Sequence, residues 1–324
     1  MLLLVSLVIV QGNVLGQETK KADQPKASKR QKKQQPPFQW VNPPSKWLKE
    51  KLPPSVAHQT FESPSLKQDV GYCIYLPPQY DQQEFLKKRF PVVYYLHGGR
   101  PGSETKSIRL TTKIDELAKA NDLAPVIYIF VNGGPVSHYN MPDDPKKQGA
   151  DVFIKELIPH IDSKYRTIAK REGRGLEGFS QGGRGTARLM FRYPELFCSA
   201  APGGGGHATE KRISESGGYE NEKLKFSEGD NTWDLARAYA KKRSTKTESN
   251  NAQPMLKILV HVGDKGFNYQ NNLEWMQHLE SLGIDHEKII VPDVGHSAID
   301  IYEKSGLEIM KFHVENFQAF NDMK

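Results

Sequence analysis

The sequence predicts an α/β fold in which a mostly parallel central sheet carries helices on both faces. Two observations predict it. Short apolar runs, typical of strands buried on both faces, alternate along the chain with segments that show the apolar period of a helix. Strands that alternate with helices form parallel sheets through right-handed crossovers. Each buried run also ends in a loop that carries glycine and a polar residue, as expected where ligands bind.

The first predicted strand shows alternating apolar residues, whereas most of the later ones are continuous apolar runs. The strands are predicted over residues 70–76, 91–96, 125–131, 174–177, 256–262 and 289–292. Helices are predicted between and after them, over residues 108–120, 153–165, 183–193, 269–282 and 299–320, with a shorter helical patch at 233–242. Since the carboxyl ends of parallel strands meet at one edge, the polar loop residues should gather there.

The start of the chain resembles an export signal. Residues 2–10 are an apolar run of nine that only Ser6 interrupts, and small residues follow as far as Gly16. A membrane-spanning helix needs about 20 apolar residues, so this run is too short to span. The pattern favours a signal peptide over residues 1–16 and a secreted or periplasmic protein, and a wrongly assigned start codon is the alternative.

A basic linker is predicted over residues 17–54, ahead of a catalytic domain over residues 55–324. Its first part, residues 17–37, is rich in Lys, Gln and Pro and lacks an apolar period, so it should be disordered. Residues 17–35 also hold five of the seven net positive charges, which leaves the rest of the chain at +2. A nucleic-acid partner is therefore not expected. The tail could contact anionic envelope or polysaccharide weakly, or be a solvated spacer.

The stretch Gly178-Phe179-Ser180-Gln181-Gly182 follows a short predicted strand and precedes a predicted helix. In that context G-x-S-x-G is the nucleophile elbow of the α/β-hydrolase fold. The tight turn holds the serine oxygen clear of the sheet and at a helix N-terminus, where negative charge is stabilised. Ser180 is therefore the predicted nucleophile.

A serine nucleophile needs a base, and the base needs an orienting carboxylate. This fold orders them as Ser, acid and His along the chain. His296 follows the last predicted strand and Asp264 follows the strand before it, so these two are predicted as base and acid. Asp293 is the rival acid, three residues before His296. The other histidines between Ser180 and the final predicted helix do not follow a predicted strand end; they are His207, His261, His278 and His286.

The oxyanion hole needs backbone N–H donors beside the nucleophile. Gln181, directly after Ser180, should supply one, and the loop after the strand that ends at residue 96 should supply the other. Gly99 is the first choice there and Gly98 the second, with His97 as a structural residue. The sequence lacks the C-x-x-C, H-E-x-x-H and P-loop motifs, so no metal or other cofactor is expected.

Residues 207–253 are polar and are predicted to be an insertion beside the pocket, after a glycine run at 203–206 in which no strand is expected. Trp233 in this insertion could stack on a sugar or aryl group of the substrate, or serve only in packing. Cys73 and Cys198 are expected to be buried free thiols rather than a disulfide, because their elements should not be neighbours in this fold.

Four segments together resemble a known family: residues 75–80 (YLPPQY), 90–99 (FPVVYYLHGG), 156–162 (ELIPHID) and 178–183 (GFSQGG). They are similar to the putative-esterase family, which includes esterase D, the feruloyl and acetyl xylan esterases of carbohydrate esterase family 1, and mycolyltransferases. The resemblance extends over residues 55–320 and places its triad at Ser180, Asp264 and His296. One departure is Gln181, where many members have Met.

The resemblance implies a serine esterase that removes acetyl or feruloyl groups from a carbohydrate or a small ester through an acyl-enzyme. Two alternatives stay open at this point. One is an acyltransferase of the same fold, because the sequence does not distinguish water from an alcohol as acceptor. The other is a non-catalytic binding protein that keeps the fold. The presence of Ser180, Asp264 and His296 favours an enzyme.

Removing residues 1–37 should leave the thermal midpoint of unfolding nearly unchanged, because a disordered tail makes few contacts with a core. Differential scanning calorimetry of the full and shortened chains measures this. A fall of several degrees in the shortened chain would show instead that the tail packs on the domain.

Overall fold

The computed structural model describes residues 37–208, 227–244 and 254–322. The chain divides into two compact units, Met1–Pro37 and Phe38–Lys324, and the helices and strands of the described residues lie in the second. The predicted signal peptide lies outside the described residues, as do residues 17–36 of the predicted linker.

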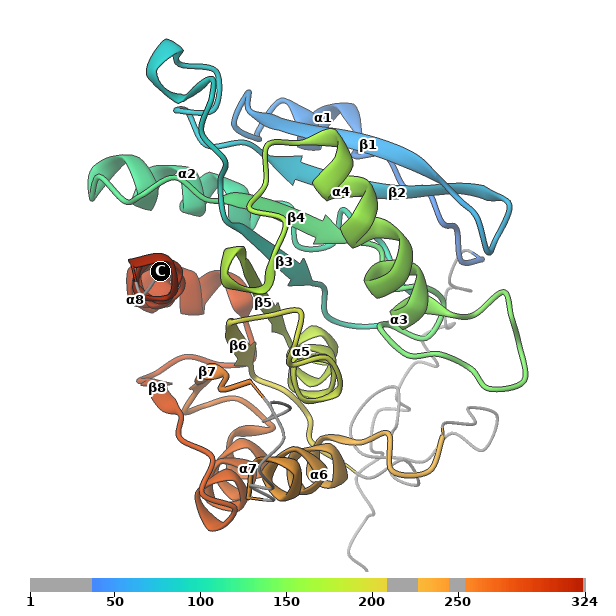
Figure 1. Ribbon diagram of the computed structural model, residues 1–324, viewed down its shortest axis with the longest axis vertical. Helices are drawn as coiled ribbons and strands as arrows, with labels where there is room; N and C mark the ends of the chain where they lie inside the picture. Colours follow the sequence, from blue (N-terminus) through green and yellow to red (C-terminus); the bar gives the residue numbers. More distant parts are fainter. Residues whose placement is uncertain (1–36, 209–226, 245–253, 323–324) are drawn as a thin grey trace, which may run out of the picture. The chain divides into compact units, whose positions relative to one another are not determined.

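An eight-stranded sheet forms the centre of the second unit, in the order β1-β2-β4-β3-β5-β6-β7-β8 (Figure 1). The strands are β1 (Val56–Ser63), β2 (Gln68–Tyr75), β3 (Val92–Leu96), β4 (Ile127–Val131), β5 (Arg174–Phe179), β6 (Ser199–Gly203), β7 (Lys257–Gly263) and β8 (Glu287–Val291). The pairs β1–β2 and β2–β4 are antiparallel and all other pairs are parallel. The predicted α/β fold with a mostly parallel sheet is confirmed.

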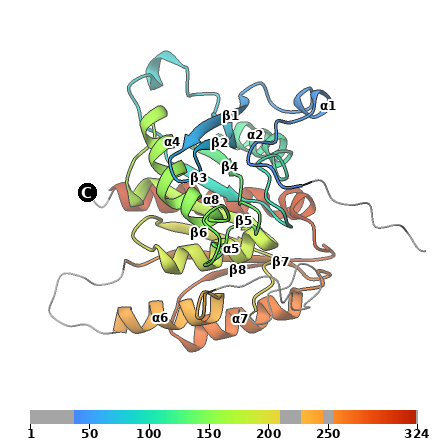
Figure 2. The ribbon, with the colours of Figure 1, turned by 90° about the vertical axis from the view of Figure 1, so that its right-hand side faces the viewer.

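Helices cover both faces of this sheet (Figures 1 and 2). One face carries α2 (Leu110–Ala120) and α8 (Ala298–Asp322). The other side carries the π-helical turn η2 (Val152–Leu157), α4 (Ile158–Lys164), α5 (Gln181–Arg192), α6 (Thr232–Ser244) and α7 (Tyr269–Ser281). The remaining short pieces are α1 (Lys46–Lys49), η1 (Gln83–Phe85), α3 (Gly149–Asp151) and η3 (Arg171–Gly173). In the part of the chain described here, every helix is too short or too polar to cross a membrane.

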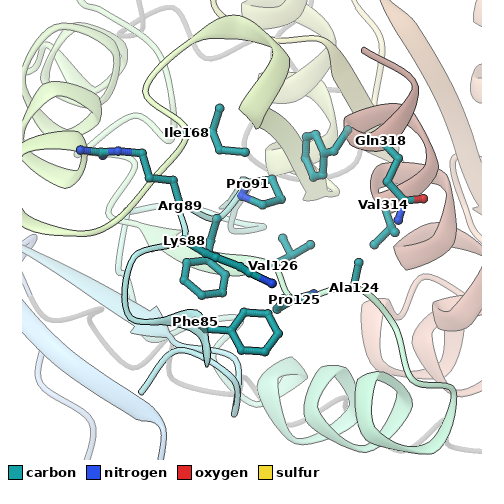
Figure 3. A pocket seen from close by; sticks show the side chains of 12 residues that line it. Phe85, Lys88, Arg89, Pro91, Ala124, Pro125, Val126, Ile168, Val314 and Gln318 are labelled. Atoms are coloured by element: carbon teal, nitrogen blue, oxygen red, sulfur yellow. The ribbon is translucent and has the colours of Figure 1, made fainter. Parts of the chain in front are cut away.

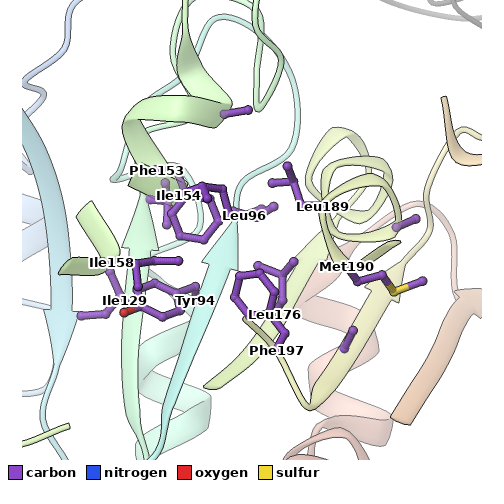
Figure 4. Close-up of a cluster of buried hydrophobic side chains, with 14 of the residues drawn as sticks. Tyr94, Leu96, Ile129, Phe153, Ile154, Ile158, Leu176, Leu189, Met190 and Phe197 are labelled. Atoms are coloured by element: carbon purple, nitrogen blue, oxygen red, sulfur yellow. The ribbon is translucent and has the colours of Figure 1, made fainter. Parts of the chain in front are cut away.

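Two apolar clusters fill the space between the sheet and its helices. Along β3, Val93 and Tyr95 point into the cluster under α2 and α8, while Tyr94 and Leu96 point into the opposite one. Figure 4 shows this second cluster, in which the ring of Phe153 from η2 lies 5.3 Å from the ring of Tyr94. Burial on both faces is the reason that the central strands appear in the sequence as continuous apolar runs.

Two strands were not predicted, and the reason differs for each. Edge strand β1 is half-buried over most of its length and lacks a clear apolar alternation. Strand β6, with the sequence SAAPG, is fully buried between β5 and β7 but is built from small residues. The expectation that no strand ends at the glycine run is therefore wrong. Glycine is required at that end, since a Cβ on Gly203 would lie 2.0 Å from the His261 ring.

The predicted linker over residues 17–54 is wrong from Phe38 onward. Trp40 is only 7% exposed and belongs to the core, and its ring centroid lies 5.0 Å from that of Phe38. The carbonyl of Trp40 also accepts the N–H of Gly71 on β2 at 2.7 Å. Because these two aromatic side chains bury apolar area, the segment is ordered despite its polar and proline-rich neighbours.

The predictions for the helical patch and for the cysteines are confirmed. Residues 233–242 fall within α6. Cys73 on β2 and Cys198, directly before β6, are both buried and free. Three strands, β4, β3 and β5, separate β2 from β6 in the sheet. The two thiols are therefore too far apart to form a disulfide.

A buried polar cluster lies beneath the sheet on the side of α8. Glu177 of β5 accepts a hydrogen bond from the Tyr302 hydroxyl at 2.6 Å, and Nε2 of His313 lies 3.7 Å from its other oxygen. Burial raises the pKa of Glu177 to about 8 and lowers the pKa of His313 to about 3. Both groups are therefore uncharged near neutral pH.

Replacing Glu177 with Gln should remove a pH dependence of stability. The folded state binds the proton of Glu177 more tightly than the unfolded state does. The protonated side chain therefore adds its full contribution to the free energy of unfolding at pH values below the pKa of Glu177 in the unfolded chain. That contribution is lost as the pH rises toward about 8. The midpoint of Glu177→Gln should therefore match the wild type near pH 4.5 and exceed it by several degrees at pH 8. Thermal unfolding at both pH values measures this.

Glu195→Gln is the matched control, because Glu195 is exposed and lies just beyond α5. Its melting curves should follow those of the wild type at every pH. Parallel pH profiles for Glu177→Gln and the wild type would mean that Glu177 is ionised in the folded protein.

Candidate active site

Ser180 occupies a tight turn between β5 and α5. Its backbone φ of 62° and ψ of −117° lie in a region that residues with side chains seldom adopt. Glycine is required on both sides of the turn. A Cβ on Gly178 would lie 2.6 Å from the carbonyl oxygen of Gly182, and a Cβ on Gly182 would lie 1.8 Å from that of Leu96. The turn thus places the Ser180 hydroxyl at the carboxyl end of the sheet, at the start of α5.

His296 lies in the loop between β8 and α8. Its Nε2 is 2.8 Å from Oγ of Ser180. The imidazole packs between two aromatic rings, with centroids 4.8 Å away for Phe179 and 4.2 Å away for Phe267. Burial lowers the pKa of His296 below its usual value. The ring is therefore uncharged at neutral pH, and Nε2 can accept the proton of the serine hydroxyl.

Asp264 directly follows β7, in a loop that packs against the loop after β8. Its Oδ1 accepts the backbone N–H of Asp293 at 2.8 Å, and its Oδ2 lies 3.4 Å from the ammonium of Lys265. Among the residues that the structure describes, none makes a hydrogen bond to Nδ1 of His296. The expected hydrogen bond between Asp264 and the ring is therefore not formed, because the carboxylate binds the neighbouring loop instead. The rival acid Asp293 has its side chain 81% exposed.

The loop after β3 approaches Ser180 through Gly98. A Cβ built on Gly98 would lie 3.2 Å from Cβ of Ser180 and 3.7 Å from its Oγ. Gly99 follows with a positive φ of 69°. Gln181 is the first residue of α5, where the helix dipole favours negative charge. The structure therefore brings Gly98 against the Ser180 side chain, with Gly99 next to Gly98 along the chain and Gln181 next to Ser180.

His97 is buried and both of its ring nitrogens bind backbone groups. Nε2 accepts the N–H of Gly133 at 3.2 Å and that of Ser103 at 3.3 Å, while Nδ1 donates to the carbonyl of Gly98 at 3.0 Å. Burial holds the pKa of His97 well below its usual value. These contacts agree with a structural role for His97 and not with a second base.

Two further candidates, His207 and Trp233, each contact another aromatic ring. His207 is buried and its ring stacks on that of Trp275, with centroids 4.0 Å apart. Trp233 lies on α6, where its ring centroid is 4.8 Å from that of His278 on α7. This contact gives Trp233 a packing partner, and its role toward the substrate stays a prediction.

Some residues near the site gave no signal in the sequence. Phe267, which is 78% exposed beside the His296 ring, sits in a loop without a motif. Ser137 and His138 lie in the loop after β4, and both have a positive φ. Hydrogen bonds join them to the loop of Gly98 and Gly99, and only the three-dimensional structure reveals those bonds.

An apolar cavity of about 310 Å³ lies at the opposite edge of the sheet (Figure 3). Its lining includes Pro91 and Pro125, which precede β3 and β4, together with Val314 and Phe317 of α8. Because Ser180 follows the carboxyl end of β5, this cavity is not part of the candidate site.

Several proteins of known structure share the fold. A ferulic acid esterase aligns with a TM-score of 0.64 and 21% identity, over 81% of this chain and 97% of its own. A fluorophosphonate-binding serine hydrolase of Staphylococcus aureus aligns with a TM-score of 0.62 and 19% identity, over 81% and 98%. At this level of identity the similarity shows the fold, which is that of the α/β-hydrolases.

Two curated relatives match a part of the sequence. An esterase of Mycobacterium tuberculosis (strain H37Rv) is 26% identical over 151 residues, which are 46% of this chain and 32% of the relative. The endo-1,4-beta-xylanase/feruloyl esterase of Xylanibacter ruminicola is 27% identical over 153 residues, which are 44% of this chain and 20% of the relative. The chain thus matches a third or less of the length of these relatives.

The family model described as "Putative esterase" matches residues 63–283, a region that contains Ser180, Asp264 and the strands from β2 to β7. This region is more than half of the chain. The chain therefore belongs to this family of esterases and has its α/β-hydrolase fold.

Proposed function

We propose that the chain is a serine esterase that hydrolyses carboxylic esters through an acyl-enzyme. The observation that carries the proposal is the distance of 2.8 Å between Oγ of Ser180 and Nε2 of His296 at a strained nucleophile turn. Family membership supports the same reaction class. A non-catalytic binding protein would have no need to keep a serine and an uncharged imidazole in this arrangement.

In the proposed first step, Nε2 of His296 takes the hydroxyl proton while Oγ of Ser180 attacks the carbonyl carbon of the ester. The bond to the alcohol then breaks, and the imidazolium gives its proton to the departing oxygen. In the second step His296 takes a proton from water while the water oxygen attacks the acyl carbon on Ser180. The bond to Oγ then breaks, the imidazolium returns its proton to Oγ, and the acid is released. The lowered pKa of His296 favours the base form that begins each step.

The negative charge that develops on the carbonyl oxygen needs donors beside Ser180. We assign these to the backbone N–H groups of Gln181 and Gly99, with Gly98 as a further candidate. Two features support this assignment: Gln181 begins α5, and Gly98 packs directly against the Ser180 side chain. Donors fixed in place before the reaction stabilise such a charge without reorganising.

Asp264 is the proposed acid of the triad. It ends the strand next to β8, and its carboxylate binds the N–H of Asp293, which lies three residues before His296. Asp264 therefore orients the loop that carries the base. Its negative charge would also stabilise the imidazolium that forms when the ring takes the serine proton.

The proposed substrates are acetyl or feruloyl esters of carbohydrates, or small esters. The names of one curated relative and of one structural neighbour support this class, since both are feruloyl or ferulic acid esterases. Export through a signal peptide at residues 1–16, with a basic tail that contacts anionic polysaccharide or envelope weakly, is part of the same proposal and rests on the sequence alone. Rates on acetyl, feruloyl and longer acyl esters would rank the candidates.

Ser180→Ala should abolish hydrolysis of p-nitrophenyl acetate and leave the thermal midpoint close to that of the wild type. Loss of the nucleophile of a triad lowers turnover by up to about 10⁶. Release of p-nitrophenol measures the activity. Ser163→Ala on α4, an exposed serine, is the control and should be fully active. More than a tenth of the wild-type rate in Ser180→Ala would exclude Ser180 as the nucleophile.

Asp264→Asn should lower kcat by about 10²–10⁴, because the variant removes the negative charge that stabilises the imidazolium. Asp293→Asn should stay within a factor of three or so of the wild type, since its side chain is exposed and its contribution to the site is a backbone N–H. Steady-state kinetics on one ester compare the two. The reverse order of effects would make Asp293 the acid.

A further inference from the structure

Three successive carbonyl oxygens in the loop after β3 each accept a hydrogen bond from a side chain. The carbonyl of His97 accepts Nε2–H of His138 at 3.0 Å, and that of Gly98 accepts Nδ1–H of His97 at 3.0 Å. The carbonyl of Gly99 accepts the hydroxyl of Ser137 at 2.5 Å. Since a carbonyl only accepts, each of these contacts identifies the atom that carries the proton.

Fixing a carbonyl also fixes the next N–H along the chain. A trans peptide unit is planar, and its C=O and N–H point in opposite directions. The bond from His138 to the carbonyl of His97 therefore sets the direction of the N–H of Gly98. In the same way, the bond from His97 to the carbonyl of Gly98 sets the direction of the N–H of Gly99. These two N–H groups are the donors that the β3 loop can offer to an oxyanion at Ser180.

The turn that supplies two of these three bonds is strained. Ser137 and His138 are consecutive residues with φ values of 42° and 68°, and they are 0% and 1% exposed. Such conformations are unfavourable for residues other than glycine and persist only where the surroundings enforce them. Here the N–H of His138 donates to the carbonyl of Gly133 at 2.7 Å, and that of Ser137 donates to the carbonyl of Gly134 at 3.3 Å.

The helix that carries the nucleophile also holds this turn. Arg188 of α5 is buried and donates through Nη1 to the carbonyl of His138 at 3.1 Å. Its guanidinium lies 3.5 Å from the ring centroid of Tyr139 and pairs with the carboxylate of Asp230. One rigid element therefore positions both Ser180 and the turn that orients the β3 loop.

We propose that His138 is a positioning residue that aims the backbone N–H of Gly98 at the oxyanion formed on Ser180, and that Ser137 supports it by holding the β3 loop at the carbonyl of Gly99. This inference rests on the proposed esterase function. Neither residue touches the reacting atoms in this arrangement. His138 acts through the peptide unit between residues 97 and 98, and Ser137 acts through the unit between residues 99 and 100. The strain at the turn is offset by the bonds that hold it, as is common where a site must be arranged before the substrate binds.

The imidazole rings of His138 and His97 keep the same protonation state across neutral pH. Burial lowers the pKa of His138 to about 3 and holds that of His97 well below its usual value. Both rings thus stay uncharged, with fixed tautomers. A positioning defect should therefore lower kcat equally across neutral pH, without a new inflection in the pH profile.

Paired substitutions at residue 138 test the inference. Nε2 of glutamine lies as many bonds from Cα as Nε2 of histidine, so His138→Gln keeps a donor with a similar reach, and His138→Met removes it at similar length. His138→Met should lower kcat about tenfold to hundredfold with KM nearly unchanged, since removal of one oxyanion donor lowers kcat by about 10²–10³. His138→Gln should recover most of that loss.

Ser137→Ala should lower kcat in the same direction but less, by about threefold to tenfold, because freeing the carbonyl of Gly99 loosens the end of the loop that holds Gly98 and Gly99 in place. Ser63→Ala is its matched control: Ser63 is a buried serine on edge strand β1 whose hydroxyl donates to Glu156. This control should change stability without changing kcat. Ser137→Gly removes the same hydroxyl at a position where glycine accepts the positive φ, so it tests the site even if the other variants unfold.

The deciding readout is inhibition by a trifluoromethyl ketone, whose adduct with a serine carries an oxyanion. Across these variants its inhibition constant should rise by the factor by which kcat/KM falls. The inference is overturned if His138→Met, Ser137→Ala and Ser137→Gly all keep the wild-type kcat, or if His138→Gln is as impaired as His138→Met. The proposed function itself fails, separately, if the wild-type protein hydrolyses none of the esters or if Ser180→Ala stays active.

Discussion

The close approach of α5 to the ends of β3 and β6 is the constraint on which the site depends. A Cβ on Gly182 would lie 1.8 Å from the carbonyl oxygen of Leu96, and a Cβ on Gly183 would lie 2.1 Å from that of Gly203. Any side chain at either position would push the first turn of the helix out of the sheet. The backbone of Gly98 could then no longer pack against Ser180, and the nucleophile and its oxyanion donors would separate.

The same helix joins parts of the chain that are distant in sequence. Its first residues form the nucleophile turn, while Arg188, two turns further on, binds the carbonyl of His138 and the carboxylate of Asp230. Burying a guanidinium is unfavourable unless it is paired and its donors are satisfied. Asp230 thus allows Arg188 to reach the loop after β4 from within the protein. The geometry of the oxyanion loop is in this way coupled to the geometry of the nucleophile.

The sequence predicted those features that depend on local chemistry. The turn at Ser180 follows from its two glycines, and the contact of His296 with Ser180 follows from its place after the last apolar run, although that strand, β8, is largely exposed at the edge of the sheet. The role of Asp264 stays a prediction. Strand β6 escaped prediction because SAAPG is built of small residues, which suit a crowded place between two strands but carry no apolar period. The turn at Ser137 and His138 was not predicted for another reason. Its positive φ values depend on hydrogen bonds to groups far along the chain, which leave no pattern in the local sequence.

The arrangement around His296 shows how packing can take over part of the role of a hydrogen bond. One carboxylate oxygen of Asp264 accepts a hydrogen bond from the N–H of Asp293. Asp293 has a positive φ of 56°, at a sharp turn in the loop after β8. The ring of His296 instead contacts the tilted rings of Phe179 and Phe267 and the hydroxyl of Ser180. Such contacts keep the imidazole uncharged by excluding water, which favours it as a base. The burial that lowers the pKa of His296 disfavours the imidazolium, and the proposed role of Asp264 is to stabilise that charge through space or after the carboxylate turns toward Nδ1.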